Sequence, residues 1–126
     1  MSTDAAPVDP AEGPLLCVET PEALASLASR IATCDLVALD IEANSMHAYR
    51  ERPCVVQLTT PRESAIVDAI AVEDLGALGD ALDREDVEVV FHGGDYDVAL
   101  LARDQGFVFH RVFDTMIAAT LLGEEK

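Results

Sequence analysis

Residues 36–42, Leu36-Val37-Ala38-Leu39-Asp40-Ile41-Glu42, form an aliphatic run that ends in two carboxylates two positions apart. Five of the seven residues are aliphatic and a turn-like pair follows at positions 44–45, so the pattern predicts a buried strand. Residues two apart in a strand point to the same face, which places Asp40 and Glu42 side by side, roughly 7 Å apart. Adjacent carboxylates repel and resist burial, and a divalent cation would offset both penalties. Since Mg²⁺ and Mn²⁺ prefer oxygen ligands, one interpretation of the pair is a metal site.

The acid pair also has a simpler interpretation, in which the strand ends where the chain emerges into solvent. The whole sequence is acidic: 24 Asp and Glu stand against 8 Lys and Arg, and the formal net charge is −16. Nucleic acid repels such a chain at long range, and the sequence lacks the basic stripe of a simple nucleic-acid-binding module. If the protein acts on nucleic acid, metal ions or a basic partner must offset the charge at the site.

The composition indicates one globular domain. A length of 126 residues, half of them hydrophobic, suits a single core. No apolar run is long enough to cross a bilayer, and the N-terminus lacks the features of a secretory signal, so we expect no membrane association. Three widely spaced cysteines in apolar surroundings predict reduced, buried thiols and a cytoplasmic protein; they are Cys17, Cys34 and Cys54.

Hydrophobic periodicity predicts alternating strands and helices in residues 15–126, after a flexible tail at residues 1–14. Thr20 and Pro21 mark the start of a helix whose buried stripe is Leu24, Leu27, Ala28 and Ile31. Further helices are predicted at residues 69–83, 95–104 and 115–122. Predicted strands cover residues 15–18, 36–41, 54–58, 64–68 and 87–91, and residues 107–109 are predicted to form a short strand or an extended piece.

These elements predict an α/β fold with a mixed sheet flanked by helices. The short link between the strands at 54–58 and 64–68 predicts a hairpin, so the first strands are antiparallel and the later βα units parallel. Ligand sites in such sheets gather at the carboxyl ends of the strands. Asp40, Glu42 and the turn that begins at His92 all fall there.

A third carboxylate follows that turn. His92-Gly93-Gly94 leads into Asp95-Tyr96-Asp97, which the pattern places in the first turn of a helix. Asp95 is expected to be the N-cap of this helix. Asp97 either complements the positive helix end or faces the strand end that carries the first two acids.

Three stretches of the sequence, in this order, resemble the ribonuclease D type of 3′–5′ exonuclease, a branch of the DEDD superfamily. They are LDIE at residues 39–42 with YR and CVVQL at 49–50 and 54–58, VFHGGDYD with LL at 90–97 and 100–101, and FDTMIAA with LLG at 113–119 and 121–123. The resemblance covers residues 15–123, nearly the whole chain after the tail. It implies a ribonuclease H-like fold and removal of nucleotides from the 3′ end of RNA or single-stranded DNA.

The resemblance also implies roles for the three acids in two-metal catalysis with Mg²⁺ or Mn²⁺. Asp40 would bind both ions, Glu42 would bind one ion and help to place the 3′-terminal nucleotide, and Asp97 would hold the second ion. In such sites the cations lie about 3.5–4 Å apart; one activates the attacking water and the other stabilises the leaving oxygen.

The sequence departs from the family in its third motif, a Tyr-x-x-x-Asp whose Asp completes the metal site and whose Tyr orients the water. Neither Tyr49 nor Tyr96 is followed by an Asp at the required spacing. Asp114 is expected to cap the last helix instead. We therefore expect a chain that lacks this segment at its C-terminal side, with weakened metal binding and poor turnover. The alternatives are a catalytically inactive remnant that binds nucleic acid or protein, and an acidic metal-binding or interaction domain.

Residues near the acid pair are candidates for substrate contact. Asn44 is placed to reach a terminal ribose or base, and Arg50 and Arg52 to contact phosphate. His92 is expected to pack at the strand end, and Gln57 to satisfy a buried backbone group. Apolar surface left without the missing segment would favour self-association or a covering partner.

Overall fold

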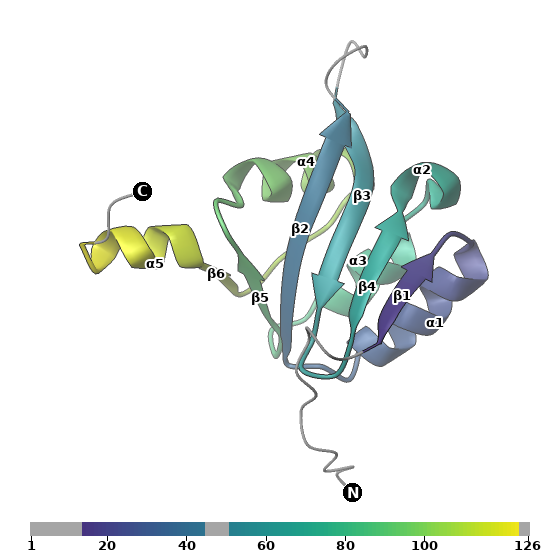
Figure 1. The fold of residues 1–126 in the computed structure, drawn as a ribbon, viewed down its shortest axis with the longest axis horizontal. Coiled ribbons are helices and arrows are strands. Elements are labelled where there is room, and N and C mark those ends of the chain that lie inside the picture. The colour runs from purple at the N-terminus through teal and green to yellow at the C-terminus, as the bar shows by residue number, and fades with distance from the viewer. Residues whose placement is uncertain (1–13, 45–50, 124–126) are drawn as a thin grey trace, which may run out of the picture.

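The computed structural model describes residues 14–44 and 51–123, which form one six-stranded sheet with helices around it (Figure 1). The predicted tail, apart from Pro14, lies outside the described residues. The strands are β1 (Leu15–Val18), β2 (Leu36–Asn44), β3 (Arg52–Thr59), β4 (Ser64–Asp68), β5 (Glu88–Phe91) and β6 (Val112–Asp114). The helices are α1 (Pro21–Ile31), α2 (Ala69–Val72), α3 (Gly76–Leu82), α4 (Asp95–Gln105) and α5 (Thr115–Leu121). None of these helices is long and apolar enough to cross a membrane.

The sheet is mixed, as the sequence predicts. Its strand order is β1-β4-β3-β2-β5-β6, and β2, β3 and β4 run antiparallel. Strands β5 and β6 extend the sheet in parallel beyond β2, and β1 joins β4 in parallel at the opposite edge. Strand β2 pairs with β5 through residues 36–38 and with β3 through residues 38–44. The C-terminal half of β2 therefore extends past the end of β5.

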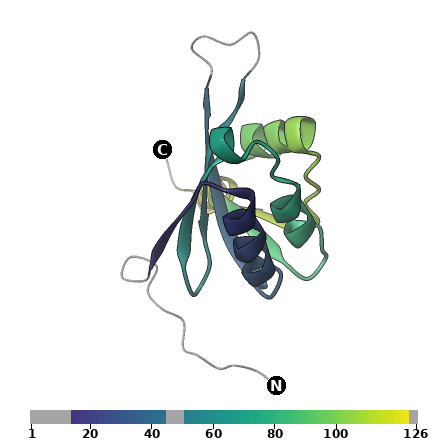
Figure 2. The ribbon, with the colours of Figure 1, turned by 90° about the vertical axis from the view of Figure 1, so that its right-hand side faces the viewer.

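Helices α1 to α4 lie on one face of the sheet, which Figure 2 shows edge-on, whereas α5 lies off the edge formed by β6 (Figure 1). We call the first face the covered face and the other, on which the described residues place no helix, the open face. Successive side chains of β2 point to the two faces in turn. Val37, Leu39 and Ile41 are buried on the covered face. Asp40 and Glu42 are exposed on the open face.

Helix α1 forms as its sequence predicts. The side chain of Thr20 accepts a hydrogen bond from the N–H of Ala23 at 3.1 Å, and Pro21 is the first helical residue. The four buried residues of α1 are those of the predicted stripe, Leu24, Leu27, Ala28 and Ile31. A cap and an apolar stripe thus suffice to define this helix, which packs between the sheet and solvent.

Residues 69–83 are mostly helical, as predicted, but the chain breaks there into two helices, α2 and α3. At the break Glu73 has a φ of 61°, in the left-handed region that favours glycine. Gln105 of α4 holds the turn from both sides. Its amide donates to the carbonyl of Glu73 at 2.9 Å, and its oxygen accepts from the N–H of Leu75 at 3.0 Å. A partner 30 residues away in sequence thus overrides the local helical pattern.

Of the two alternatives predicted for residues 107–109, a short strand or an extended piece, the strand is wrong. Phe107 is buried and packs over Gly79, where an added side-chain carbon would lie 2.9 Å from the ring. Phe109 meets Phe91 edge-on, with ring centroids 5.4 Å apart. The strand forms instead at β6, whose backbone pairs with β5. The two aromatic residues are therefore anchors of a loop.

Two predictions of burial fail. Cys17 is exposed, and Cys34 and Cys54 are half-buried, although all three are free thiols. Gln57, predicted to satisfy a buried backbone group, is exposed. In register, Cys17 lies opposite Ile66, Ile66 opposite Gln57, and Gln57 opposite Asp40. These residues form one row across the open face, which leaves their side chains accessible.

Candidate active site

The two acids of residues 36–42 lie where β2 extends past β5. Asp40 lies opposite Gln57 on β3, and Glu42 lies opposite Val55. On its other edge, this part of β2 faces the turn that leads from β5 into α4. The strand end and the helix start therefore meet at one place.

Asp97 reaches that place from the first turn of α4. Its carboxylate accepts a hydrogen bond from the backbone N–H of Ile41 and shares one with the side chain of Asp40. The pKa of Asp97 is raised to about 6, mainly by burial and further by the charges of Asp40 and Glu42, whereas the Ile41 N–H opposes the rise. The structure thus brings together the three carboxylates that the sequence analysis singles out.

The carboxylates of this cluster are the right type of ligand for a divalent cation, but too few of them lie close together to complete its coordination. Two carboxylates that share a hydrogen bond need a proton between them, and a divalent cation can replace that proton. Carboxylate oxygens are the ligands that Mg²⁺ and Mn²⁺ prefer. Within residues 14–44 and 51–123, however, no three Asp, Glu, His or Cys side chains lie close enough to surround one ion. Asp40 and Asp97 form the close pair, and Glu42 adds its charge to them.

The turn that presents Asp97 depends on two glycines. Gly94 packs against Phe91, where a side-chain carbon would lie 2.4 Å from the Phe91 Cβ, and Gly93 has a φ of 65°. Any other residue would strain this turn. Gly94 is also the N-cap of α4, so the prediction that Asp95 caps this helix is wrong. Asp95 is the first helical residue and is exposed.

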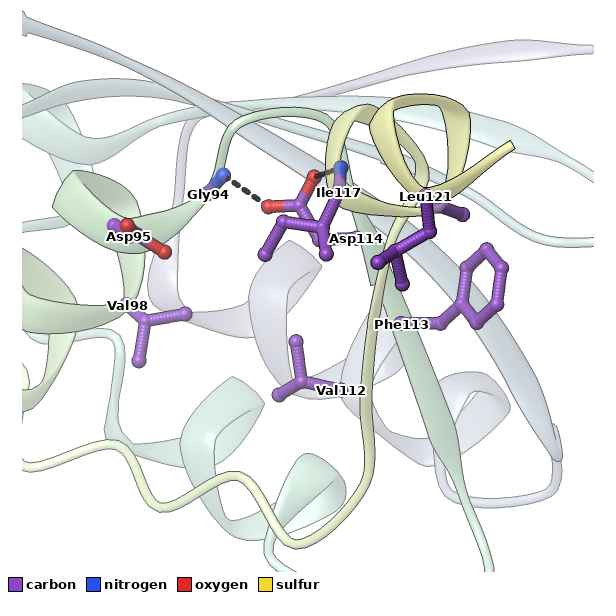
Figure 3. Close-up of a pocket in the computed structure, with 9 residues that line it drawn as sticks. Gly94, Asp95, Val98, Val112, Phe113, Asp114, Ile117 and Leu121 are labelled. Carbon is purple, nitrogen blue, oxygen red and sulfur yellow. Dashed lines mark hydrogen bonds between the residues drawn. The ribbon is translucent and has the colours of Figure 1, made fainter. Parts of the chain in front are cut away.

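Asp114 fastens the same turn to α5 (Figure 3). Its carboxylate accepts hydrogen bonds from the N–H groups of Gly94 at 2.8 Å and Gly93 at 2.9 Å, and from those of Met116 and Ile117 in α5. These backbone donors, Gly94 first, lower the pKa of Asp114 to about 2. The prediction that Asp114 caps the last helix is confirmed, and its oxygens are engaged by backbone groups.

A hollow of about 400 Å³, which mixes apolar and polar side chains, lies beside Asp40 on the open face. Gln57, Thr59, His92 and Thr115 contribute its polar side chains. His92 is exposed and its Nδ1 lies 2.8 Å from the Thr115 hydroxyl, so it does more than pack at the strand end. No local sequence pattern connects these residues with Asp40. The signal is the strand register, because Gln57 becomes a neighbour of Asp40 once β2 and β3 are paired.

A larger hollow of about 650 Å³ lies between α4 and α5 and is mainly apolar (Figure 3). Ile117 and Leu121 face it from α5, and both are exposed, Leu121 by 81%. Val98 of α4, Val112 and Phe113 of β6 and Ala118 of α5 add to its apolar lining. Such a surface is where the sequence analysis expects self-association or a covering partner, which stays a prediction.

Two of the three predicted substrate-binding residues, Asn44 and Arg52, lie at the end of the β2–β3 pair that follows Glu42. Asn44 and Arg52 are register partners there, two positions beyond Glu42, and both are exposed. Arg50 lies outside the described residues. Substrate contact by Asn44 and Arg52 therefore stays a prediction, made from residues that lie at the hairpin end next to the acids.

A mixed sheet with two acids on an inner strand, β2, and a third on helix α4, which follows the neighbouring strand β5, is the arrangement of the ribonuclease H-like class of α/β proteins. Residues 16–126 match the family described as 3′–5′ exonuclease, and the chain belongs to this family. The fold and family expected from the sequence are thus confirmed.

Named relatives agree with this assignment. The chain is 36% identical over 107 residues to ribonuclease D of Nitrobacter hamburgensis, which covers 84% of this chain and 28% of that protein. The catalytic core of RRP6 from Trypanosoma brucei superposes with a TM-score of 0.87 at 28% identity, over 94% of this chain and 34% of that one. The complex of Trypanosoma brucei RNase D with RNA U12 shares the fold, with a TM-score of 0.71 at 22% identity, over 82% of this chain and 38% of that one. The chain spans well under half the length of each.

Proposed function

We propose that this chain provides the carboxylate site of a 3′–5′ exonuclease domain that shortens single-stranded RNA from its 3′ end with Mg²⁺ or Mn²⁺. One observation carries the proposal. Asp97 of α4 shares a hydrogen bond with Asp40 of β2, beside the charge of Glu42, in a chain of the exonuclease family. The three side chains would be the metal ligands, and Glu42 would also help to place the 3′-terminal nucleotide.

The bound cations would supply the Lewis acidity that activates water and stabilises the leaving oxygen in two-metal sites. The chain's own residues would set the geometry for this. The N–H of Ile41 orients the carboxylate of Asp97, and the Gly93-Gly94 turn lets α4 begin close to the end of β2. The pKa of Asp97 is raised to about 6, so this carboxyl must be deprotonated before both Asp97 and Asp40 act as ligands.

We propose RNA as the substrate because one relative is a ribonuclease D and one structural neighbour was solved with RNA U12. At the hairpin end, Arg52 would contact a phosphate and Asn44 a ribose or base. A net charge of −16 opposes the approach of a polyanion. Cations at the acid cluster would offset this repulsion where the 3′ end docks.

An exonuclease assay tests the proposal. The substrate is a 5′-labelled oligouridylate with a free 3′-hydroxyl, incubated with the chain and Mn²⁺, Mg²⁺ or a chelator. We expect a ladder of 3′-shortened products that needs the metal and falls more than about 100-fold in Asp40→Asn or Asp97→Asn. Asp95→Asn, an exposed acid in the same helical turn as Asp97, is the matched control and should retain activity.

Two results would replace the proposal. If the RNA binds in the presence of metal but is not shortened, the chain is a nucleic-acid-binding domain without turnover. If all variants behave alike and the metal changes neither binding nor shortening, the carboxylate cluster has another role.

A further inference from the structure

Two side chains of α4 donate hydrogen bonds to Glu51, the residue that directly precedes β3. The Tyr96 hydroxyl donates a hydrogen bond to the carboxylate of Glu51, and Nη2 of Arg103 donates to the Glu51 carbonyl oxygen at 2.5 Å. Tyr96 and Arg103 are seven residues apart, two helical turns, so they lie on the same face of α4. We call Glu51, Tyr96, Arg103 and Asp104 the Glu51 clasp.

Asp104 holds the guanidinium of Arg103 in the position from which it contacts Glu51. Its two carboxylate oxygens accept from Nε of Arg103 at 2.7 Å and from Nη2 at 3.2 Å. The Asp104 side chain is only 8% exposed, whereas that of Arg103 is 50% exposed. A buried carboxylate therefore holds the guanidinium by two bonds and aims one nitrogen at Glu51.

The clasp acts on the part of the hairpin that β5 does not support. Strand β5 pairs with β2 through residues 36–38, and Glu42 lies beyond that point. Glu51 directly precedes Arg52, which pairs with Asn44 two residues after Glu42. The clasp thus joins the hairpin end that carries Glu42 to the helix that carries Asp97.

We propose that Tyr96 and Arg103 are positioning residues, which act through Glu51 to fix the distance between Glu42 and Asp97. This inference rests on the proposed function, because it assumes that the three acids act together on a metal ion. Stability alone does not account for the clasp. Exposed polar contacts contribute little to folding, and Tyr96 is 48% exposed.

Mn²⁺ affinity and hydrogen exchange test the proposal without measuring turnover. Tyr96→Phe removes the hydroxyl and keeps the ring, and Arg103→Met removes the donor and keeps the stem. Each should weaken Mn²⁺ binding, measured by the electron paramagnetic resonance of free Mn²⁺, by about tenfold, the lower end of the loss that follows removal of a residue behind a metal ligand. Amide exchange of residues 41–44 should become faster. Arg111→Met is the matched control, because Arg111 is an exposed cation that pairs with Glu88 at 3.7 Å, away from the acids.

A conservative variant separates geometry from charge. Glu51→Gln keeps an oxygen that can accept from Tyr96, so it should bind Mn²⁺ nearly as wild type does, whereas Glu51→Ala should resemble Tyr96→Phe. The proposal is overturned if the Tyr96→Phe, Arg103→Met double variant binds Mn²⁺ within a factor of about two of wild type while Asp97→Asn loses binding. If Asp97→Asn also binds normally, the proposed function fails, and the clasp proposal fails with it.

Discussion

The two faces of the sheet place stability and chemistry on opposite sides of the same strands. On the covered face, Val37, Leu39 and Ile41 are buried beneath helices. On the open face, Asp40 and Glu42 are exposed, and a hollow with several polar side chains lies beside Asp40. Because the side-chain period of a strand is two, β2 serves both faces without a compromise at any one position. The comparison teaches that substitutions on the two faces should have separable effects.

The largest expected change in the free energy of unfolding comes from a substitution in the core beneath the covered face. Leu27 of α1 is fully buried, so Leu27→Ala should lower the free energy of unfolding by about 2–5 kcal/mol through lost transfer energy and a cavity. Leu15→Ala is the matched control on the open face, where Leu15 is 61% exposed, and should change it by less than about 0.5 kcal/mol. Urea denaturation measures both. Equal losses would contradict the separation of the two faces.

The next largest change is a gain in stability, and it comes from a substitution in the acid cluster. A carboxyl whose folded pKa is raised to about 6 stabilises the fold below its unfolded pKa, and this contribution is lost as the pH rises through about 6. Asp97→Asn should therefore stabilise the metal-free protein at neutral pH by about 1 kcal/mol. Partial exposure screens most of the about 2.7 kcal/mol that two pKa units represent.

Urea unfolding in a chelator checks this, with Asp95→Asn as the control. The gain from Asp97→Asn should vanish near pH 4. A variant that is less stable than wild type at neutral pH would show that the carboxylate of Asp97 supports the fold rather than weakens it.

Asp114 lies next to the acid cluster but differs from it, because its carboxylate stabilises the fold. A folded pKa of about 2 means that its contribution to stability is present above the unfolded pKa and is lost as the pH falls through about 2. Asp114→Asn keeps one acceptor oxygen, so either the Gly93–Gly94 turn or the cap of α5 loses bonds. The thermal midpoint at neutral pH should fall by a few degrees. Circular dichroism melts should show this difference shrinking toward pH 2; a constant difference would point to another cause.

The smallest effect concerns the break between α2 and α3. Glu73→Gly should raise the free energy of unfolding by about 0.5–1 kcal/mol, since glycine adopts the φ of 61° without strain. Glu73→Ala removes the same charge but keeps Cβ, so it should bring no such gain. Equal stability of the two variants in urea would mean that the turn is unstrained.

Local signals are strong enough to predict much of the architecture. Thr20, Pro21 and an apolar stripe define α1 from its own residues. The alternation around Asp40 and Glu42 predicts a strand that presents two acids on one face. The spacing of the His92-Gly93-Gly94 turn and Asp97 leads to the third acid. All of these depend on contacts within a few residues, or on the period of a single element.

The features that sequence analysis misses depend on distant partners. The break at Glu73 requires Gln105, and the place of β6 requires the edge of β5. Cys17 and Gln57 lie in apolar strands, and burial follows only if both faces of the sheet are covered. Which face the helices cover is decided by tertiary packing, so local periodicity cannot supply it.

One hydrogen bond at the site gives the protein a built-in spectroscopic probe. The backbone N–H of Ile41 lies on an edge of β2 that has passed the end of β5, and it donates to the carboxylate of Asp97 instead of to a strand. An amide proton shift follows the charge of its acceptor. The single Ile41 resonance in a nitrogen–proton spectrum should therefore move when Asp97 loses its proton or takes up a cation, while the amides of residues 36–38 stay still. Occupancy of the site can thus be followed from one backbone signal, with no substrate present.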